Sequence, residues 1–369
     1  MDKREEIYQR LVTEYKGQSG IYDLSPRLGK TRIGIGIIKK IEPVSILWVT
    51  PSTKLRDEDI PSEFSKWKAK KYLKRLTAIT WSSLKNETGT YDIIFLDELQ
   101  KITSLNSKNL FNGKLKGKKI IALTGTLSKD DEKKELIKRL GLGIIETITV
   151  DNAVDDEIIA DYQINVVECN LNTTDKNVKA GSKANSFLQT EASAYLYKDK
   201  QAKQAMFSGN PKYATFRILD RRRFIMDSPT KEEIAQKLFN SLGERVIMFT
   251  TSIKQCERMS KHTYHSKTDN TDIDKFQAQT IKKIALVESG GIGYTYKNVD
   301  HFILMQASSD KNGDTSQKIL RSALKQKDYK AQIWIISLLG TQDETWVSKA
   351  LSSFNADKIK YVNVKNIRL

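Results

Sequence analysis

The chain has 369 residues, of which 39% are hydrophobic and 29% charged, and a formal net charge of +17. This length favours two domains with cores of their own over one small domain. No apolar run approaches the roughly 20 residues of a membrane-spanning helix, and the two cysteines and three histidines form no zinc-binding pattern. The basic excess favours a polyanionic partner such as nucleic acid, although a surface rich in solvated lysine gives the same excess.

The first half of the chain alternates between helix and strand patterns. Residues 1–19 are predicted to form an amphipathic helix, and 130–140 a second helix. Short β-branched runs bounded by Gly, Pro or charge predict strands at 20–24, 45–50, 76–80, 91–96, 119–123 and 144–150. Such alternation is typical of a parallel sheet covered by helices on both faces, so we expect an α/β fold.

The rhythm breaks at about 170–225, which is polar and mostly helical in pattern, with a turn at Gly209-Asn210-Pro211. We interpret this stretch as a mainly helical insertion or bridge between two lobes. Helix and strand patterns then return, with a helix predicted at 229–242. Strands are predicted at 245–250, 284–287, 301–305, 332–337 and, at a sheet edge, 358–364.

A candidate phosphate-binding loop follows the first predicted strand and opens a predicted helix. At its end stand Gly29, Lys30 and Thr31. A helix start of this kind binds phosphate through backbone N–H groups, with Lys on the β- and γ-phosphates and Thr on Mg²⁺. The full pattern has Gly where this chain has Leu24, and an ordinary helix start is the alternative. We expect nucleotide contacts from Arg27, Leu28, Gly29, Lys30, Thr31 and Arg32.

A second candidate site is the acidic pair that follows the predicted strand 91–96. The apolar run delivers Asp97 and Glu98 to the carboxyl end of a buried strand, which is where open α/β sheets bind ligands. Asp97 can hold Mg²⁺ together with Thr31, and Glu98 can act as the general base for an attacking water. The alternative is that both carboxylates cap a helix.

The segment Asp97-Glu98-Leu99-Gln100 resembles the DExH/DExQ box of superfamily 2 helicases and translocases. Thr124, Gly125 and Thr126 resemble the family's third motif. The resemblance implies two RecA-like lobes at 1–150 and 228–369, a bridge at 151–227, and ATP and Mg²⁺ as ligands. It also implies that Gln100, Thr124, Gly125 and Thr126 couple the γ-phosphate to lobe movement. The compact architecture looks most like bacteriophage-encoded DNA helicases.

Several hydroxyl-bearing segments resemble the family's nucleic-acid motifs. Hydroxyls and N–H groups at strand ends suit phosphodiester contacts, which give affinity without sequence preference. Turn or cap duty is the alternative for each segment. The candidates are Pro51, Ser52, Thr80, Trp81 and Ser82 in the first lobe, Thr250 and Ser252 in the second, and Arg222 in the bridge.

The second lobe carries segments that resemble the fifth and sixth motifs. Gly293 and Thr295 occupy the fifth, with Thr in place of the usual acid or amide. Gln317 and Arg321 resemble the sixth, which implies that Arg321 acts catalytically as an arginine finger alongside Gln317. Leu324 stands where a second Arg is usual, so Lys325 is the candidate substitute for coupling.

The resemblance implies an ATP-dependent motor on DNA, single-stranded or forked, with RNA possible. The alternatives are a double-strand translocase, an RNA helicase or a nucleotide-gated module that does not hydrolyse ATP. Gln9, with Gln18 as a rival, is the candidate for adenine recognition. We expect aromatics such as Tyr195, Tyr197 and Phe207 to be core residues. The charged N-terminus lacks a signal core, so we expect a cytoplasmic monomer, in the host cytoplasm if the chain is phage-encoded, with no membrane partner.

Overall fold

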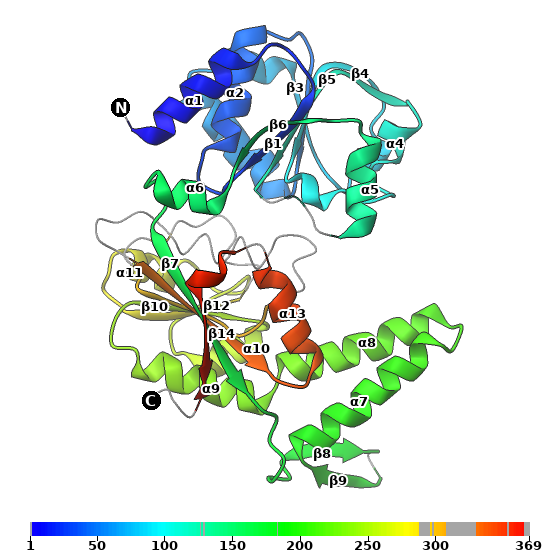
Figure 1. The fold of residues 1–369 in the computed structure, drawn as a ribbon, viewed down its shortest axis with the longest axis vertical. Coiled ribbons are helices and arrows are strands. Elements are labelled where there is room, and N and C mark those ends of the chain that lie inside the picture. Colours follow the sequence, from blue (N-terminus) through cyan, green and yellow to red (C-terminus); the bar gives the residue numbers. More distant parts are fainter. Residues whose placement is uncertain are drawn as a thin grey trace. The chain divides into compact units, whose positions relative to one another are not determined.

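The computed structural model describes residues 2–125, 127, 130–182, 184–287, 296, 299–307, 330–352 and 354–364. The chain forms two compact units that divide between Ile159 and Ala160. Each unit is built on a parallel sheet flanked by helices, as in a RecA-like lobe (Figure 1). The predicted α/β fold class is therefore confirmed.

Unit 1 contains a six-stranded sheet with the order β3-β2-β4-β5-β1-β6, in which every neighbouring pair is parallel. Its strands are β1 (Gly20–Leu24), β2 (Ile46–Thr50), β3 (Leu76–Thr80), β4 (Gly89–Asp97), β5 (Leu115–Thr124) and β6 (Ile144–Ile148). Its helices are α1 (Lys3–Glu14), α2 (Lys30–Ile41), α3 (Ile60–Lys66), α4 (Lys108–Phe111), α5 (Asp131–Arg139) and α6 (Val150–Asp155). Figure 1 shows α1 and α2 on one side of this sheet and α4 and α5 on the other.

Helix α2 approaches the sheet closely because it presents glycine at the point of contact. A Cβ on Gly34 would lie 2.6 Å from the ring of Trp48, closer than real side chains come. Trp48 stacks on Phe95 of the neighbouring strand, with ring centroids 4.6 Å apart. The start of α2 is therefore fixed against the middle of the sheet, where the carboxyl ends of β1, β5 and β4 lie side by side.

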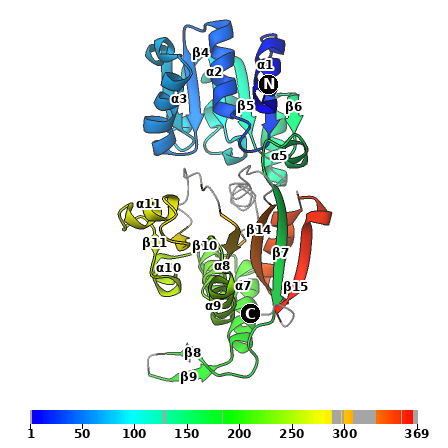
Figure 2. The ribbon, with the colours of Figure 1, turned by 90° about the vertical axis from the view of Figure 1, so that its left-hand side faces the viewer.

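Unit 2 contains a seven-stranded sheet with the order β11-β12-β10-β13-β14-β7-β15, again parallel throughout. Its strands are β7 (Asp161–Cys169), β10 (Val246–Thr250), β11 (Thr263–Tyr264), β12 (Lys283–Val287), β13 (His301–Leu304), β14 (Lys330–Leu338) and β15 (Ile359–Asn363). Its helices include α9 (Pro229–Ser241), α10 (Ile253–Met259), α11 (Thr271–Gln277) and α13 (Gln342–Leu351). The predicted edge strand near the C-terminus is confirmed as β15 (Figure 2).

The predicted bridge 151–227 differs from the structure in its first part. Strand β7 lies inside this range, yet it is an inner strand of the unit 2 sheet, between β14 and β15. Gln163 and Asn165 interrupt its apolar pattern, which hides the strand in the sequence. Both amides are satisfied within the sheet, by the carbonyl of Lys358 and the side chain of Gln332. The next part is an antiparallel pair, β8 (Val178–Gly181) and β9 (Ser186–Gln189).

The rest of that range is helical, as predicted. Helices α7 (Glu191–Met206) and α8 (Pro211–Met226) lie side by side and are joined by the predicted turn. Figure 1 shows the pair extending away from the unit 2 sheet.

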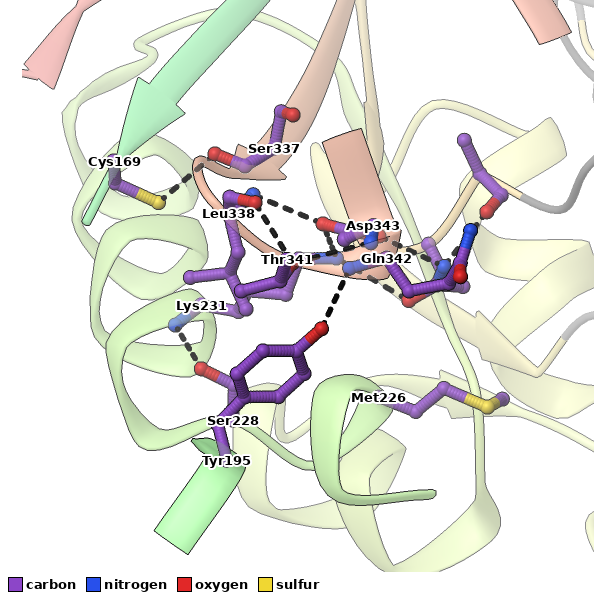
Figure 3. Close-up of polar contacts among 12 residues, drawn as sticks. Cys169, Tyr195, Met226, Ser228, Lys231, Ser337, Leu338, Thr341, Gln342 and Asp343 are labelled. Atoms are coloured by element: carbon purple, nitrogen blue, oxygen red, sulfur yellow. Dashed lines mark hydrogen bonds and ion pairs between the residues drawn. The ribbon is translucent and has the colours of Figure 1, made fainter. Parts of the chain in front are cut away.

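A fully buried ion pair ties the elements of unit 2 together (Figure 3). Lys231 of α9 lies 2.7 Å from the carboxylate of Asp343 at the start of α13, and neither side chain has any solvent exposure. Gln306, just after β13, donates to Asp343 and accepts from Lys231. The backbone N–H of Leu338 also donates to Asp343. Each charge is therefore compensated, which is what a buried charge requires to be tolerated.

Candidate functional site

The parallel order of the unit 1 sheet brings the predicted nucleotide motifs to one edge. Asp97 ends β4 opposite Leu123, and Thr124 ends β5 opposite Asp23 of β1. The acidic pair, the Thr-Gly segment and the phosphate loop therefore follow three neighbouring strands at their carboxyl ends. This edge is where open α/β sheets bind their ligands.

The phosphate loop ends in a residue whose backbone requires glycine. Gly29 precedes α2 with φ 79° and ψ 45°, in the left-handed region, and its carbonyl accepts the first helical hydrogen bond from Ile33 at 3.0 Å. Lys30 then begins α2, and its ammonium lies 3.5 Å from the carbonyl of Leu24. A helix start preceded by such a turn is a general anion-binding site.

The absence of a side chain at Gly125 leaves room for the Lys30 ammonium. A Cβ on Gly125 would lie only 3.0 Å from Nζ of Lys30 and 3.5 Å from Pro26. Any larger side chain at this position would displace the ammonium or the loop. The residue after β5 and the lysine of the phosphate loop therefore lie close together, although 95 positions separate them in the sequence.

The remaining predicted loop residues have varied surroundings. Leu28 is buried, and its N–H donates to the carbonyl of Ser25 at 3.4 Å, so its side chain belongs to the core. Arg27 adopts φ 76°, an unusual value for a residue other than glycine. Such conformations concentrate at functional sites. Thr31 lies in the first turn of α2 and is partly buried.

Arg32 is held by a cluster on the outer side of α2. Its guanidinium lies between the rings of Tyr8 and Trp67, 3.8 Å and 4.0 Å from their centroids, and makes a 2.6 Å ion pair with Glu5. Gln9, the candidate for adenine recognition, donates to the same Glu5 at 2.8 Å. Arg32 and Gln9 are thus linked through one carboxylate.

The sequence reasoning missed Glu5, Tyr8 and Trp67 in this cluster. No periodicity connects segments near positions 5, 32 and 67, so the sequence holds no signal for their meeting.

The acidic pair has an electrostatic signature. Burial and the neighbouring Glu98 raise the pKa of Asp97 to about 7, while Lys30 opposes the rise. The backbone at Glu98 is left-handed with φ 54°, and its N–H donates to the Asp97 carboxylate at 3.0 Å. The indole of Trp81 donates to the Asp97 carbonyl at 2.8 Å. A carboxyl group such as Asp97, whose raised pKa reflects resistance to ionisation, is suited to receive a cation.

A chain of side-chain hydrogen bonds connects the acidic pair to the end of β5. The amide nitrogen of Gln100 donates to Glu98, and the hydroxyl of Thr124 donates to the amide oxygen of Gln100 at 2.8 Å. Gln100 and Thr124 are buried. Lys133 of α5 donates to the Gln100 carbonyl at 2.5 Å, a contact that the sequence did not suggest. A displacement of the segment after β5 would therefore shift the Glu98 side chain through these hydrogen bonds.

The residues at this edge fit Mg²⁺ bound together with a nucleotide. The part of the chain that the structure describes contains no group of three or more His, Cys, Asp or Glu side chains that could hold a metal. Mg²⁺ does not require such a group, because it is usually bound through one or two carboxylates, waters and substrate phosphates. Asp97, with its raised pKa, and the hydroxyl of Thr31 supply donors of this kind.

The nucleic-acid candidates of unit 1 follow β2 and β3 along the same edge. Ser52 accepts from the N–H of Leu55 at 3.3 Å, just after Pro51. Thr80 exchanges a 2.8 Å hydrogen bond with the exposed Ser82. Trp81 is buried in the core cluster, so its ring is not available to bases.

In unit 2 the candidate hydroxyls already have structural partners. Thr250 donates to the carbonyl of Leu286 at 3.1 Å, and Ser252 caps α10 by accepting from Gln255 at 3.2 Å. Arg222 is exposed on α8, with its guanidinium 6.0 Å from the centroid of the Trp346 ring. The candidates that lie outside the described residues are Thr126, Gly293, Thr295, Gln317, Arg321 and Lys325.

Comparison with known proteins supports the fold. No family model matches the chain, and no curated protein matches it in sequence. The DNA-bound ATP-dependent Type ISP restriction-modification enzyme LlaBIII is 14% identical, with a TM-score of 0.60 over 98% of this chain and 31% of that chain. S. cerevisiae Dbp5 bound to RNA and ADP BeF3 is 11% identical, with a TM-score of 0.55 over 99% of this chain and 90% of that chain.

This chain therefore spans less than a third of the length of the restriction enzyme. At these identities the likeness shows the fold alone, which is that of two RecA-like lobes, each a parallel sheet flanked by helices. Among the described residues, no helix is long and apolar enough to cross a membrane.

Proposed function

We propose that this chain is an ATP-dependent nucleic-acid motor, a helicase or translocase whose nucleotide site lies at the carboxyl edge of the unit 1 sheet. One observation carries the proposal. Lys30, the pair Asp97 and Glu98, and the segment Thr124–Gly125 come from three separate stretches of sequence and meet at that edge. A phosphate loop and an acidic pair at the same edge of one sheet, with a single strand between them, are what ATP hydrolysis needs.

Each residue has a role that its surroundings support. The start of α2 and the Lys30 ammonium bind and orient the β- and γ-phosphates. Asp97 and Thr31 would hold Mg²⁺, which supplies positive charge against the phosphate oxygens. Glu98, oriented by Gln100, accepts the proton of the attacking water. The roles of Arg321 and Gln317 as catalytic residues, and of Lys325, Gly293, Thr295 and Thr126 in coupling, remain predictions from the resemblance.

We propose single-stranded or forked DNA as the preferred substrate, with RNA as the alternative. LlaBIII was solved bound to DNA and Dbp5 bound to RNA, and both share the fold of this chain. The net charge of +17 suits either polymer. Pro51, Ser52, Thr80 and Ser82 are at the edge of the sheet where backbone phosphates would be contacted.

Steady-state ATP hydrolysis with and without single-stranded DNA or RNA tests the proposal. Wild type is expected to hydrolyse ATP faster with its preferred polymer. Glu98→Gln is expected to lower the stimulated rate by about 10²- to 10⁴-fold, the usual contribution of a general base. A strand-displacement assay then separates a helicase from a double-strand translocase.

Glu87→Gln is the matched control, because Glu87 precedes the opposite end of the same strand and accepts from the Tyr91 hydroxyl at 2.8 Å. This variant should retain wild-type hydrolysis. If wild type binds ATP but hydrolyses none with any nucleic acid, the motor is refuted. A nucleotide-gated binding module would then be the remaining function.

A further inference from the structure

Helices α7 and α8 form a hairpin whose base is embedded in unit 2. The ring of Tyr195 and the side chain of Ile225 belong to the core cluster. The N–H of Gln342 donates to the Tyr195 hydroxyl at 2.9 Å (Figure 3), and Arg221 reaches the Gln342 side chain at 3.4 Å. The buried Glu191 accepts from Ser228 and Thr230. The base of the hairpin is therefore fixed to the core of unit 2, and the distal half extends from this base.

The distal half of this hairpin, residues 196–219, exposes its large apolar side chains. Phe207 in the turn is 89% exposed and Phe216 is 58% exposed. The two helices meet through small residues, since Ala202 and Ala205 are the buried ones here. The aromatics consequently point away from the interface between the helices. Other exposed apolar side chains of the distal half are Leu196, Tyr197, Met206, Tyr213 and Leu219.

The charged residues of the distal half leave a net positive excess. Asp220 is paired with Lys198 at 2.7 Å, and Asp199 is paired with Lys203 at 2.7 Å and with Arg221. The Asp199 carboxylate of this half and the Asp220 carboxylate next to it are thus neutralised. Among the described residues, Lys200, Lys212 and Arg217 have no carboxylate partner.

Arg217 joins the positive charge to the aromatic surface. Its Nε donates to the hydroxyl of Tyr213 at 3.2 Å, and its guanidinium lies 5.2 Å and 5.6 Å from the ring centroids of Tyr213 and Phe216. A cation held between exposed aromatic rings can contact a phosphate while a base stacks beside it. Stacking platforms flanked by basic residues are typical of proteins that bind single-stranded nucleic acid.

We propose that the distal half of the α7–α8 hairpin is a nucleic-acid-binding surface that takes unpaired bases. Phe207 and Phe216 stack on the bases, and Lys200, Lys212 and Arg217 neutralise the backbone. The surface is separate from the strand-end residues of the proposed motor, and its assignment to nucleic acid rests in part on that proposed function. A protein partner fits less well, because a second folded surface would have to match both unpaired cations and isolated aromatics with carboxylates and pockets.

Binding of fluorescein-labelled oligothymidine to the full chain without nucleotide tests this surface. The double variant Phe207→Ala, Phe216→Ala is expected to weaken binding by at least about tenfold, since each stacked base contributes roughly 1–3 kcal/mol, or 5- to 150-fold. Phe187→Ala is the matched control, because Phe187 lies on β9 of the same unit with the same 58% exposure as Phe216. It should bind as wild type does.

A second variant tests the charge. Lys200→Gln with Lys212→Gln should reduce the steepness of log affinity against log salt by about 1.4, as expected when two phosphate contacts on a single strand are lost. All these side chains are exposed, so the melting temperature should remain that of wild type.

Unchanged affinity in the double Phe variant would overturn the proposal. So would the loss of self-association in that variant, seen by sedimentation, with oligothymidine binding intact, because the surface would then dock protein. The assay contains no ATP. If oligothymidine binding depends on the hairpin but the chain has no ATPase activity, this inference is supported and the motor is refuted. If the chain is an active ATPase but the hairpin variants bind oligothymidine as wild type does, the motor is supported and this inference is refuted.

Discussion

The two units differ in how they surround the carboxylates that follow their strand ends. In unit 2, Asp343 is fully enclosed, and its oxygens receive Lys231, the Gln306 amide and a backbone N–H. In unit 1, Asp97 adjoins a second carboxylate, Glu98, and its pKa is raised to about 7 by burial and that neighbour. Lys30 opposes this rise without forming an ion pair. Both clusters follow the carboxyl ends of parallel strands, so position alone does not distinguish them.

What distinguishes the clusters is whether the charge is compensated within the chain. A compensated carboxylate such as Asp343 fixes neighbouring elements in place. A carboxylate without a close cationic partner, such as Asp97, costs stability and persists where a cation or a reacting group completes it. The contrast supports a structural role for Asp343 and the ligand-binding role proposed for Asp97, and it can be tested by removing each charge in turn.

The largest expected effect comes from breaking the compensated cluster. Lys231→Met leaves the Asp343 carboxylate buried without its cation, which should lower the free energy of unfolding by about 3–5 kcal/mol. Urea denaturation measures the change. Adding Asp343→Asn removes the stranded charge, so the double variant should recover part of the loss.

Lys237→Met is the matched control for this experiment. Lys237 is on the same helix and lies at the same 2.7 Å from its partner Glu233, but both side chains are more than half exposed. Exposed pairs contribute about 0–1 kcal/mol, so this variant should be nearly as stable as wild type. Equal losses for Lys231→Met and Lys237→Met would contradict the structural role of the buried pair.

Removal of the Asp97 charge should change stability in the opposite direction. Because the folded pKa of Asp97 is raised above its unfolded value, the folded state loses stability as pH rises from about 4 to about 7. Asp97→Asn removes this loss. Without Mg²⁺, the variant should be more stable than wild type by about 4 kcal/mol at pH values above about 7, because the folded pKa lies about 3 pH units above the unfolded value, and the gap should close toward about pH 4. Melting temperatures across this pH range give the measurement.

Asp92 on the same strand provides a control, because its pKa is shifted in the opposite direction. Its pKa is lowered by the 2.7 Å ion pair with Lys118 and by hydrogen bonds from Val44 and Ser45. The ionised Asp92 side chain stabilises the folded state at pH values above its unfolded pKa, and this stabilisation is lost as pH falls through its lowered folded pKa. Asp92→Asn should therefore destabilise the protein at neutral pH. An Asp97→Asn variant that behaves like Asp92→Asn would refute the uncompensated state of Asp97.

Much of the fold could be predicted from the periodicity of apolar residues and from the Gly, Pro and charged residues that bound each element. The strands at 20–24 and 76–80 have the predicted bounds, and the helix that starts at Pro229 is capped by Ser228. Because parallel strands place their carboxyl ends at one edge, the approach of Lys30 to the acidic pair could also be anticipated.

Other features depended on contacts that the sequence does not encode locally. Strand β7 was hidden by amides that are satisfied only by neighbouring strands. Of the aromatics expected in the core, Tyr195 is buried, but Tyr197 and Phe207 are exposed. Helical spacing predicted a buried face, whereas alanines supply the contact between α7 and α8.

The smallest expected effect comes from the hydrogen-bond chain that leaves the acidic pair. Thr124→Val keeps the shape of the side chain but removes the hydroxyl that donates to Gln100, which should cost about 1 kcal/mol of stability. Thr124→Ser keeps the donor and should restore both stability and activity. If the chain through Gln100 links the segment after β5 to Glu98, Thr124→Val should lower the ratio of nucleic-acid-stimulated to basal ATP hydrolysis more than it lowers the basal rate. A proportional fall in both rates would mean that Thr124 supports the site only as a packing residue, because coupling alone acts on the ratio.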